Sequence, residues 1–181
     1  NLKKEIKIIT PWPGMMKDII NGKKEWNKYW DSKNNFRLFD LATIKNRSIY
    51  VHGRNDDVIN IRGHRIGSGE IESTVLRIKE IIETCAINIL DELEGSKIYL
   101  FVVSKKNVDT QIEKILLSTF GSFAIPKKII KVSELPKTKS GKFLRRLLRS
   151  LIENPNLSNL GDTSTILNYR SINIIKKELT K

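Results

Sequence analysis

The sequence has a single cysteine, Cys85, among its 181 residues, which excludes an internal disulfide and fits a reducing compartment. Cys85 lies in an apolar run, and this favours a buried structural thiol over a nucleophile. No apolar run reaches the ~20 residues that a transmembrane helix needs. Nothing at the start resembles a signal peptide, and no internal repeat is visible. We therefore expect a cytoplasmic protein that is neither a disulfide scaffold nor a repeat array.

Positive charge is in excess. The sequence has 33 Lys and Arg and 20 Asp and Glu, which gives a net charge of +13. Such a charge favours anionic partners, namely nucleotides, coenzyme A, nucleic acid or acidic lipid. Much of the excess is lysine scattered among Asn and Ile, which is typical of a solvated surface. Composition alone leaves both interpretations open. With 39% hydrophobic residues the chain can form a core.

The hydrophobic periodicity predicts strands that alternate with helices. Strands are predicted over 6–9, 36–41, 48–52, 58–61, 84–90, 98–103 and 128–132, and helices over 23–30, 69–76, 111–120 and 142–152. Ser68 is placed to cap the second of these helices. In the last one, leucines share one face and Arg145, Arg146 and Arg149 share the other. The order of elements predicts a small α/β sandwich.

A glycine-rich, charged stretch, GRNDDVINIRGHRIGSGEIE, runs from Gly53 to Glu72. Glycine supplies backbone conformations with positive φ at little steric cost, and three arginines crowd the same span with two aspartates. An acidic pair followed by a short strand and a glycine-flanked arginine suits a swivel beside a phosphate site. The same spacing suits a surface hairpin, and spacing alone does not separate the two.

The second candidate functional motif is the lysine-rich stretch LPKTKSGK, from Leu135 to Lys142. Pro136 and Gly141 bracket a loop, and Lys142 is predicted to stand at the start of a helix, where free N–H groups and the helix dipole attract anions. A lysine there adds a mobile charge that can reach a phosphate or carboxylate. The spacing is not that of a Walker A loop. A solvated basic surface remains the alternative.

Both stretches resemble motifs of the adenylate-forming enzymes. The form DDVIN-x-x-GHRIG-x-x-EIES is similar to the hinge motif of the acetyl-CoA synthetase branch. The form P-K-T-x-S-G-K-x-x-R-R resembles the motif that carries the catalytic lysine, and it follows at the expected distance. Residues 159–165, NLGDTST, are similar to the tail of acetyl- and propionyl-CoA synthetases. The resemblance extends from about residue 11 to residue 165.

The resemblance implies an α+β fold. Residues 1–56 would end the large adenylate-forming domain as a β-rich tail, 57–155 would form the small mobile C-terminal α/β sandwich, and 156–181 would be a C-terminal tail. The large N-terminal domain is the implied partner. It holds the phosphate loop and the acyl pocket, so we expect this polypeptide alone to make no acyl-CoA.

The implied activity is that of an AMP-forming acetate–CoA ligase. In this family a carboxylate and ATP, with Mg²⁺, first form an acyl-adenylate and pyrophosphate. The small domain then rotates, and the thiol of coenzyme A displaces AMP. Acetate is the expected acid, and propionate or another short-chain acid is the alternative.

The resemblance also assigns roles by position. Lys142 would be the catalytic lysine and a site of reversible acetylation; Asp40, Arg54 and Arg65 would bind ATP; Asp56 would be the hinge; Arg62 and Gly63 would lie against coenzyme A; and the main-chain carbonyls of Leu76, Ile78 and Ile81 would hold a cation. Acetylation would remove the charge of Lys142. Reversible acetylation of Lys142 also implies a lysine acetyltransferase and a deacetylase as partners.

The sequence departs from the family pattern at three places. The family's T-G-D reads Leu38-Phe39-Asp40, Arg62 stands where a small residue is usual, and Leu117 replaces an arginine that contacts a phosphate of coenzyme A. Lys114 lies one helical turn before Leu117 and is placed to substitute.

Two other functional classes remain open. A basic nucleic-acid-binding module would depend on the charge and on the basic helix at 142–149, and it predicts aromatics among the basic residues. The aromatics instead cluster in the first forty residues. A purely protein-binding domain is the other alternative.

Overall fold

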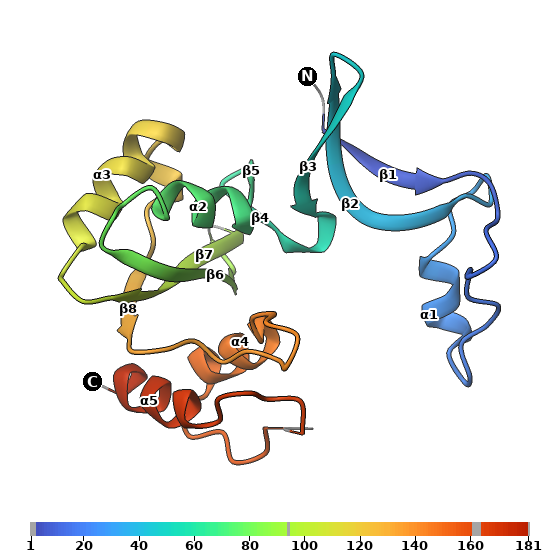
Figure 1. Cartoon of the computed structure of the whole chain (residues 1–181). Coiled ribbons are helices and arrows are strands. Elements are labelled where there is room, and N and C mark those ends of the chain that lie inside the picture. The colour runs from blue at the N-terminus through green and yellow to red at the C-terminus, as the bar shows by residue number, and fades with distance from the viewer. Residues whose placement is uncertain (1–2, 94, 161–163, 181) are drawn as a thin grey trace. The chain divides into compact units, whose positions relative to one another are not determined.

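The computed structural model describes residues 3–93, 95–160 and 164–180, without the side chain of Asp56. The chain divides into two compact units, Asn1–Val58 and Ile59–Lys181, which we call the N-terminal and C-terminal units (Figure 1). Helices and strands are mixed throughout, and the strands form three small sheets, so the predicted class of fold is confirmed.

The N-terminal unit is an antiparallel three-stranded sheet with one short helix. Its elements are β1 (Lys4–Ile8), α1 (Lys23–Lys28), β2 (Phe36–Lys45), β3 (Ser48–Arg54) and the 3₁₀ turn η1 (Asn55–Asp57). β2 is the central strand. It is joined to β3 through Asn46 and Arg47, both with positive φ (52° and 62°). Two successive left-handed residues define a type I′ turn, whose twist matches that of an antiparallel hairpin.

Aromatic rings and one carboxylate hold α1 and its flanking loop to the sheet. The rings of Trp12 and Trp30 lie edge-on to Phe36 at centroid distances of 5.3 Å each. Asp31 accepts hydrogen bonds from Lys7 Nζ at 2.8 Å and from the Asn35 N–H at 2.9 Å. These donors, the Lys7 ammonium first, hold the pKa of Asp31 well below its ordinary value.

The N-terminal unit buries little apolar surface of its own. Among its described residues, Ala42 is the one buried apolar side chain. Ile44, Ile49 and Val51 on β2 and β3 are between 61% and 73% exposed. A sheet normally packs one face against another layer. The described part of this unit therefore lacks a hydrophobic core of ordinary size.

The C-terminal unit is built on a mixed sheet in the order β6-β7-β8. β6 (Ile81–Asp91) and β7 (Gly95–Ser104) form an antiparallel pair, and β8 (Lys128–Val132) runs parallel to β7. Alternate residues on these strands enter two different cores, as the period of a strand requires. Leu100 and Val102 belong to one core, and Phe101 and Val103 to the other.

Helices cover both faces of this sheet (Figure 1). The first core lies under α2 (Ser68–Val75), α3 (Asp109–Phe120) and the hairpin of β4 (Val58–Ile61) and β5 (His64–Gly67). A 3₁₀ turn, η2 (Ser122–Ala124), follows α3. The second core lies under α4 (Arg145–Glu153) and α5 (Arg170–Leu179). The result is a three-layered α/β/α arrangement. No helix in the described ranges is both long and apolar enough to cross a membrane.

Several local predictions need correction. The residue before α2 is Gly67, whose N–H donates to Glu70 Oε2 at 3.0 Å, whereas Ser68 is buried inside the helix and does not cap it. Strand β5 and helix α5 were not predicted. Cys85 is fully buried, as its apolar surroundings predicted.

Candidate functional site

The predicted catalytic lysine lies on a loop with a fixed backbone. Residues 135–144, here called the lysine loop, fold back so that Lys137 and Phe143 form an antiparallel bridge. Inside that bridge the Thr138 N–H donates to the Lys142 carbonyl at 2.9 Å, and the Lys142 N–H donates to Thr138 Oγ1 at 3.1 Å. Gly141 closes the turn with φ = 83°, a conformation that favours glycine. The side chain of Lys142 is exposed at the tip of this loop.

The prediction that Lys142 begins a helix is wrong. Helix α4 starts at Arg145, because the chain first makes a loop contact in which the Leu144 N–H donates to the Pro136 carbonyl at 3.0 Å. The backbone N–H of Lys142 is therefore already paired and is not a free donor of a helix N-terminus. The charge on this loop comes from its lysines.

Two arginines of α4 face the protein and not the solvent, which corrects the predicted basic face. Arg145 makes a bidentate ion pair with Glu72 of α2, at 2.5 and 2.9 Å. Its Nη1 also donates to the Ala86 carbonyl at 3.2 Å. Arg149 Nε donates to the Asn88 carbonyl of β6 at 3.1 Å. Arg146 alone of the three is exposed. These contacts fasten the helix that follows the lysine loop to α2 and β6.

The first lysine of the loop is paired. Lys137 Nζ forms an ion pair with Glu83 and lies 5.5 Å from the centre of the Phe143 ring. Cation–π contacts of this length are attractive. Lys137 thus anchors the base of the loop to β6, whereas Lys142 extends from its tip.

The β4–β5 hairpin carries three of the predicted ligand-contacting residues. Arg62 (φ = 50°) and Gly63 (φ = 84°) form a type I′ turn between the paired strands β4 and β5, so a surface hairpin is present at the position where the sequence also suggested a swivel. Nothing lies within 4 Å of a Cβ built on Gly63, so its conformation and not crowding favours glycine there. Arg65 is exposed on β5.

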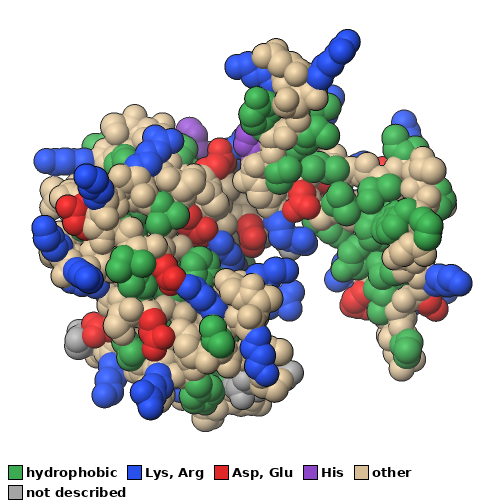
Figure 2. All heavy atoms as spheres, viewed as in Figure 1, with side chains coloured by type: hydrophobic (Ala, Val, Ile, Leu, Met, Phe, Trp, Pro, Cys, Tyr) green, Lys and Arg blue, Asp and Glu red, His purple; other side chains and the backbone are tan. Residues whose placement is uncertain are grey.

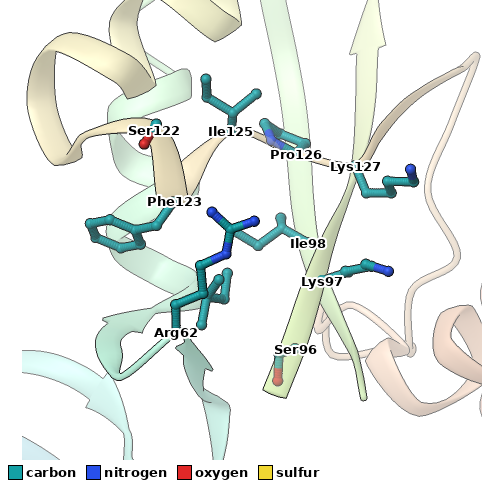
Figure 3. Close-up of a pocket in the computed structure, with 10 residues that line it drawn as sticks. Arg62, Ser96, Lys97, Ile98, Ser122, Phe123, Ile125, Pro126 and Lys127 are labelled. Atoms are coloured by element: carbon teal, nitrogen blue, oxygen red, sulfur yellow. The ribbon is translucent and has the colours of Figure 1, made fainter. Parts of the chain in front are cut away.

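A pocket of about 280 Å³ opens beside this turn (Figure 3). Arg62 extends its guanidinium between Phe123 and Ile98, and Lys97 and Lys127 also line the pocket. The remaining lining residues are Ile61, Ser96, Ser122, Ile125 and Pro126. Lys97 is ion-paired with Asp91. No acidic residue is among those that line the pocket, so its walls are positively charged.

The ring of Phe123 is held in place next to that pocket. It stacks on the His64 imidazole with a centroid distance of 4.3 Å and an interplanar angle of 9°. Sequence reasoning missed this pair, because His64 and Phe123 are far apart in the chain and only the packing of η2 against the hairpin brings them together.

In the N-terminal unit the structure brings together two predicted ATP-binding residues. Asp40 on β2 and Arg54 on β3 are directly opposite partners in the antiparallel ladder. The Arg54 guanidinium lies 5.8 Å from the ring of Phe39. Phe39 has φ = 62°, so this residue keeps the left-handed conformation that suits the glycine of the family's T-G-D.

The remaining predicted residues lie elsewhere. Asp56 belongs to η1 and lies two residues before Val58, where the N-terminal unit ends. Its side chain is outside what the structure describes. Leu76, Ile78 and Ile81 lie at the turn from α2 to β6, where the Ile78 carbonyl accepts the Ile81 N–H at 3.0 Å. Gly161, Asp162 and Thr163 of the third motif fall outside the described residues.

Comparison with known proteins identifies one domain of this chain. Residues 70–142, which extend from α2 to Lys142, match the model of the AMP-binding enzyme C-terminal domain. This segment belongs to that domain family. Similarity to curated proteins extends well beyond the segment. It is 34% identical to acetyl-coenzyme A synthetase of Coprinopsis cinerea over 95% of this chain and 28% of the relative. It is 37% identical to that of Penicillium chrysogenum over 86% of this chain and 24% of the relative.

Solved structures share the fold of this chain. Acetoacetyl-CoA synthetase from Streptomyces lividans aligns with a TM-score of 0.69 at 23% identity, over 88% of this chain and 25% of that chain. ATP-bound MatB from Rhodopseudomonas palustris aligns with a TM-score of 0.65 at 23% identity, over 74% of this chain and 27% of that chain. The chain thus spans about a quarter of the length of the relatives that it matches.

Proposed function

We propose that this chain is the C-terminal portion of an AMP-forming acetyl-CoA synthetase and that it supplies the lysine of the adenylation step. The observation that carries the proposal is the lysine loop. It presents the exposed side chain of Lys142 on a hydrogen-bonded turn at the end of the matched domain. Relatives named acetyl-coenzyme A synthetase at 34–37% identity support the choice of reaction.

In the first half-reaction an acetate oxygen attacks the α-phosphorus of ATP, and pyrophosphate leaves. Negative charge then builds up on the phosphate oxygens and on the carboxylate. The ammonium of Lys142, held by a fixed loop backbone, would lie against that charge. Preorganised charge of this kind contributes about 3–4 kcal/mol, or 10²–10³ in rate. Mg²⁺ bound with ATP would neutralise part of the triphosphate charge.

Three side chains would hold the nucleotide. Asp40 would accept hydrogen bonds from the ribose hydroxyls, because an ionised carboxylate has two acceptor oxygens. Arg54 and Arg65 would pair with phosphate oxygens through their planar guanidinium groups. The direct pairing of Asp40 with Arg54 across the sheet supports a shared ligand for these two.

In the second half-reaction the thiol of coenzyme A attacks the acetyl carbonyl, and AMP leaves. Gly63 has no side chain and would let the extended ligand approach the backbone of the β4–β5 turn. Arg62 would give a phosphate contact beside the positively charged pocket with Lys97 and Lys127. This set would compensate for Leu117, which is 50% exposed on α3 and carries no charge.

A hinge near Asp56 would let the C-terminal unit rotate between the half-reactions. The boundary between the two compact units, which falls after Val58, supports a flexible point there. The carbonyls of Leu76, Ile78 and Ile81 would hold a hard cation through oxygen ligands. They fit that role in chemistry, since a carbonyl that accepts one N–H keeps a second lone pair.

The remaining expectations concern the whole enzyme. The upstream large domain would cover the exposed apolar side chains of β2 and β3, and this chain alone would make no acyl-CoA. The protein would act in the cytoplasm, and acetylation of Lys142 by an acetyltransferase, reversed by a deacetylase, would switch adenylation off. Acetate remains the proposed acid, with propionate or another short-chain acid as the alternative, because the acyl pocket would lie in the large domain.

The test is Lys142→Ala in the complete enzyme that contains this chain. We expect ATP–pyrophosphate exchange with acetate to fall by about 10²–10³. The release of acetyl-CoA from presynthesised acetyl-adenylate and coenzyme A should change little. Lys139→Ala is the matched control, because Lys139 is an exposed lysine of the same loop. An unchanged exchange rate in Lys142→Ala would refute the proposal.

Two observations bear on the nucleic-acid alternative. On the face shown in Figure 2, Lys and Arg side chains are spread over the surface, among hydrophobic and acidic ones, and do not form one continuous patch. Two of the three arginines of the basic helix are used in contacts within the protein. Both findings favour the ligase over a polynucleotide-binding module.

A further inference from the structure

The lysine loop is held from outside by a segment that follows it in sequence. Residues 164–168, here called the brace, pair with the loop in the manner of a short strand, with a bridge between Thr138 and Ile166. The Lys139 N–H donates to the Thr165 carbonyl at 3.0 Å, and the Leu167 N–H donates to the Lys137 carbonyl at 2.8 Å.

Asn168 ends the brace and uses its whole amide on the loop. Its Oδ1 accepts the Lys137 N–H at 3.0 Å. Its Nδ2 donates to the Leu135 carbonyl at 2.7 Å and to Glu134 Oε2 at 2.8 Å. A single side chain thus satisfies a donor and an acceptor of the loop backbone and ties both to a carboxylate. The same three bonds need an acceptor and two donors in one plane, which only an amide side chain offers.

The position of these bonds matters for Lys142. The turn that carries Lys142 is closed by bonds between residues 138 and 142, and Asn168 fixes the strand that enters this turn at Leu135 and Lys137. The strand that leaves it runs into α4, which Arg145 and Glu72 fasten to the sheet. Asn168 and Arg145 therefore hold the two sides of one loop.

We propose that Asn168 is a positioning residue for adenylation: its amide fixes the entering strand of the lysine loop, and through it the site from which Lys142 reaches the substrate. The physical part of this proposal concerns the loop alone. Its chemical part rests on the proposed role of Lys142. Fixing the loop before the reaction lowers the cost of placing a long lysine side chain.

The first experiment uses this chain as it stands and measures hydrogen exchange of the loop amides. In Asn168→Ala we expect the amide of Lys137, which loses its acceptor, to exchange at least about tenfold faster, which equals about 1.4 kcal/mol and lies within what the lost hydrogen bonds remove. The amide of Lys139, which donates to the Thr165 carbonyl of the brace, should also exchange faster. Amides of β6 and β7 should keep their protection. Asn173→Ala is the matched control, because Asn173 is exposed on α5. Unchanged exchange at Lys137 and Lys139 would overturn the proposal.

A second pair of variants guards against a loss of folding. Asn168→Asp keeps the size and the acceptor but loses both donors and places a carboxylate against Glu134. We expect this variant to exchange faster at Lys137 than the wild type. Adding Glu134→Gln supplies a donor to the new carboxylate and should restore part of the protection. If the double variant is no better than Asn168→Asp alone, the bond to Glu134 does not contribute as proposed.

The chemical part is tested in the complete enzyme. Asn168→Ala should lower the rate of acetyl-adenylate formation about tenfold at saturating substrate, with little change in KM for ATP and in thioester formation from presynthesised acetyl-adenylate. Suppose that Asn168→Ala makes the loop amides exchange faster but leaves the adenylation rate unchanged, while Lys142→Ala lowers that rate. This result would refute the positioning role of Asn168 and leave the proposed function intact. If Lys142→Ala itself has no effect, the proposed function fails first.

Discussion

Removal of the Arg145 guanidinium should destabilise the C-terminal unit more than removal of any exposed arginine. Arg145 makes two charge-assisted bonds to Glu72 and one to the Ala86 carbonyl. In Arg145→Ala the Glu72 carboxylate keeps the Ala86 N–H, at 2.7 Å, but loses its cation. A carboxylate that stays buried without its partner costs the protein its desolvation energy.

The magnitude follows from how far the pair is shielded from water. The side chains are 27% and 12% exposed, so the pair lies between a surface ion pair, worth under about 1 kcal/mol, and a fully buried one, whose disruption costs about 3–5 kcal/mol. We expect a loss of about 2–3 kcal/mol in the free energy of unfolding. With a urea m-value of about 1–3 kcal/mol/M, the midpoint should fall by roughly 1–2 M.

The assay has to report on the right unit. All three tryptophans, Trp12, Trp26 and Trp30, lie in the N-terminal unit. Tryptophan emission therefore follows that unit, whereas far-ultraviolet circular dichroism also follows the helices of the C-terminal unit. Urea titrations of Arg145→Ala should shift the dichroism midpoint and leave the emission midpoint in place.

The control is Arg146→Ala, a neighbouring and exposed arginine of the same helix. We expect its free energy of unfolding to stay within about 0.5 kcal/mol of the wild type. The reasoning is refuted if Arg145→Ala and Arg146→Ala behave alike. It is also refuted if Glu72→Ala with Arg145→Ala loses more than the sum of the single variants, because removal of both members of a pair should cost less than that sum.

Three further predictions concern the N-terminal unit. Arg47→Gly should stabilise it by about 0.5–1 kcal/mol, seen as a higher emission midpoint, because Arg47 has φ = 62° in a type I′ turn; a lower midpoint would contradict this. The unit should unfold at lower urea than the C-terminal unit, since its described residues bury one apolar side chain, Ala42; coincident transitions would contradict this. The lowered pKa of Asp31 means that its stabilisation is present above the unfolded pKa of about 3.9 and is lost as the pH falls below it. Tryptophan emission should report that loss, and Asp31→Asn should flatten it.

Periodicity predicted the sheet and three of its covering helices because each strand alternates and each helix buries one stripe. β8 was predicted with the bounds that the structure has, Lys128–Val132. The helix α5 (Arg170–Leu179) was not predicted, although Ile172, Ile175 and Leu179 have the i, i+3, i+7 spacing of a helix with one apolar face. The segment is short and follows a polar stretch, and periodicity alone does not show that it packs on the second core.

The candidate site was predicted by residue identity and not by geometry. Matching motifs placed Lys142, Arg62 and Asp40 by position, and the structure shows where each lies. The contacts that support them join residues distant in the chain, such as Glu72 with Arg145 and Asn168 with Lys137. Single-sequence patterns extend over one helix or strand, so pairings of this kind follow only from the packed fold.

The order of synthesis gives the brace a particular consequence. Residues 164–168 leave the ribosome after the lysine loop, so the amides of Lys137 and Lys139 find their partners only once the brace has been translated. A polypeptide cut short before the brace would also lack α5, whose Ile172 and Ile175 are fully buried in the second core. Premature termination there would therefore remove the outer support of the lysine loop and one covering helix of the sheet at the same time. The loop can take up its final hydrogen bonds only when the end of this chain has been made.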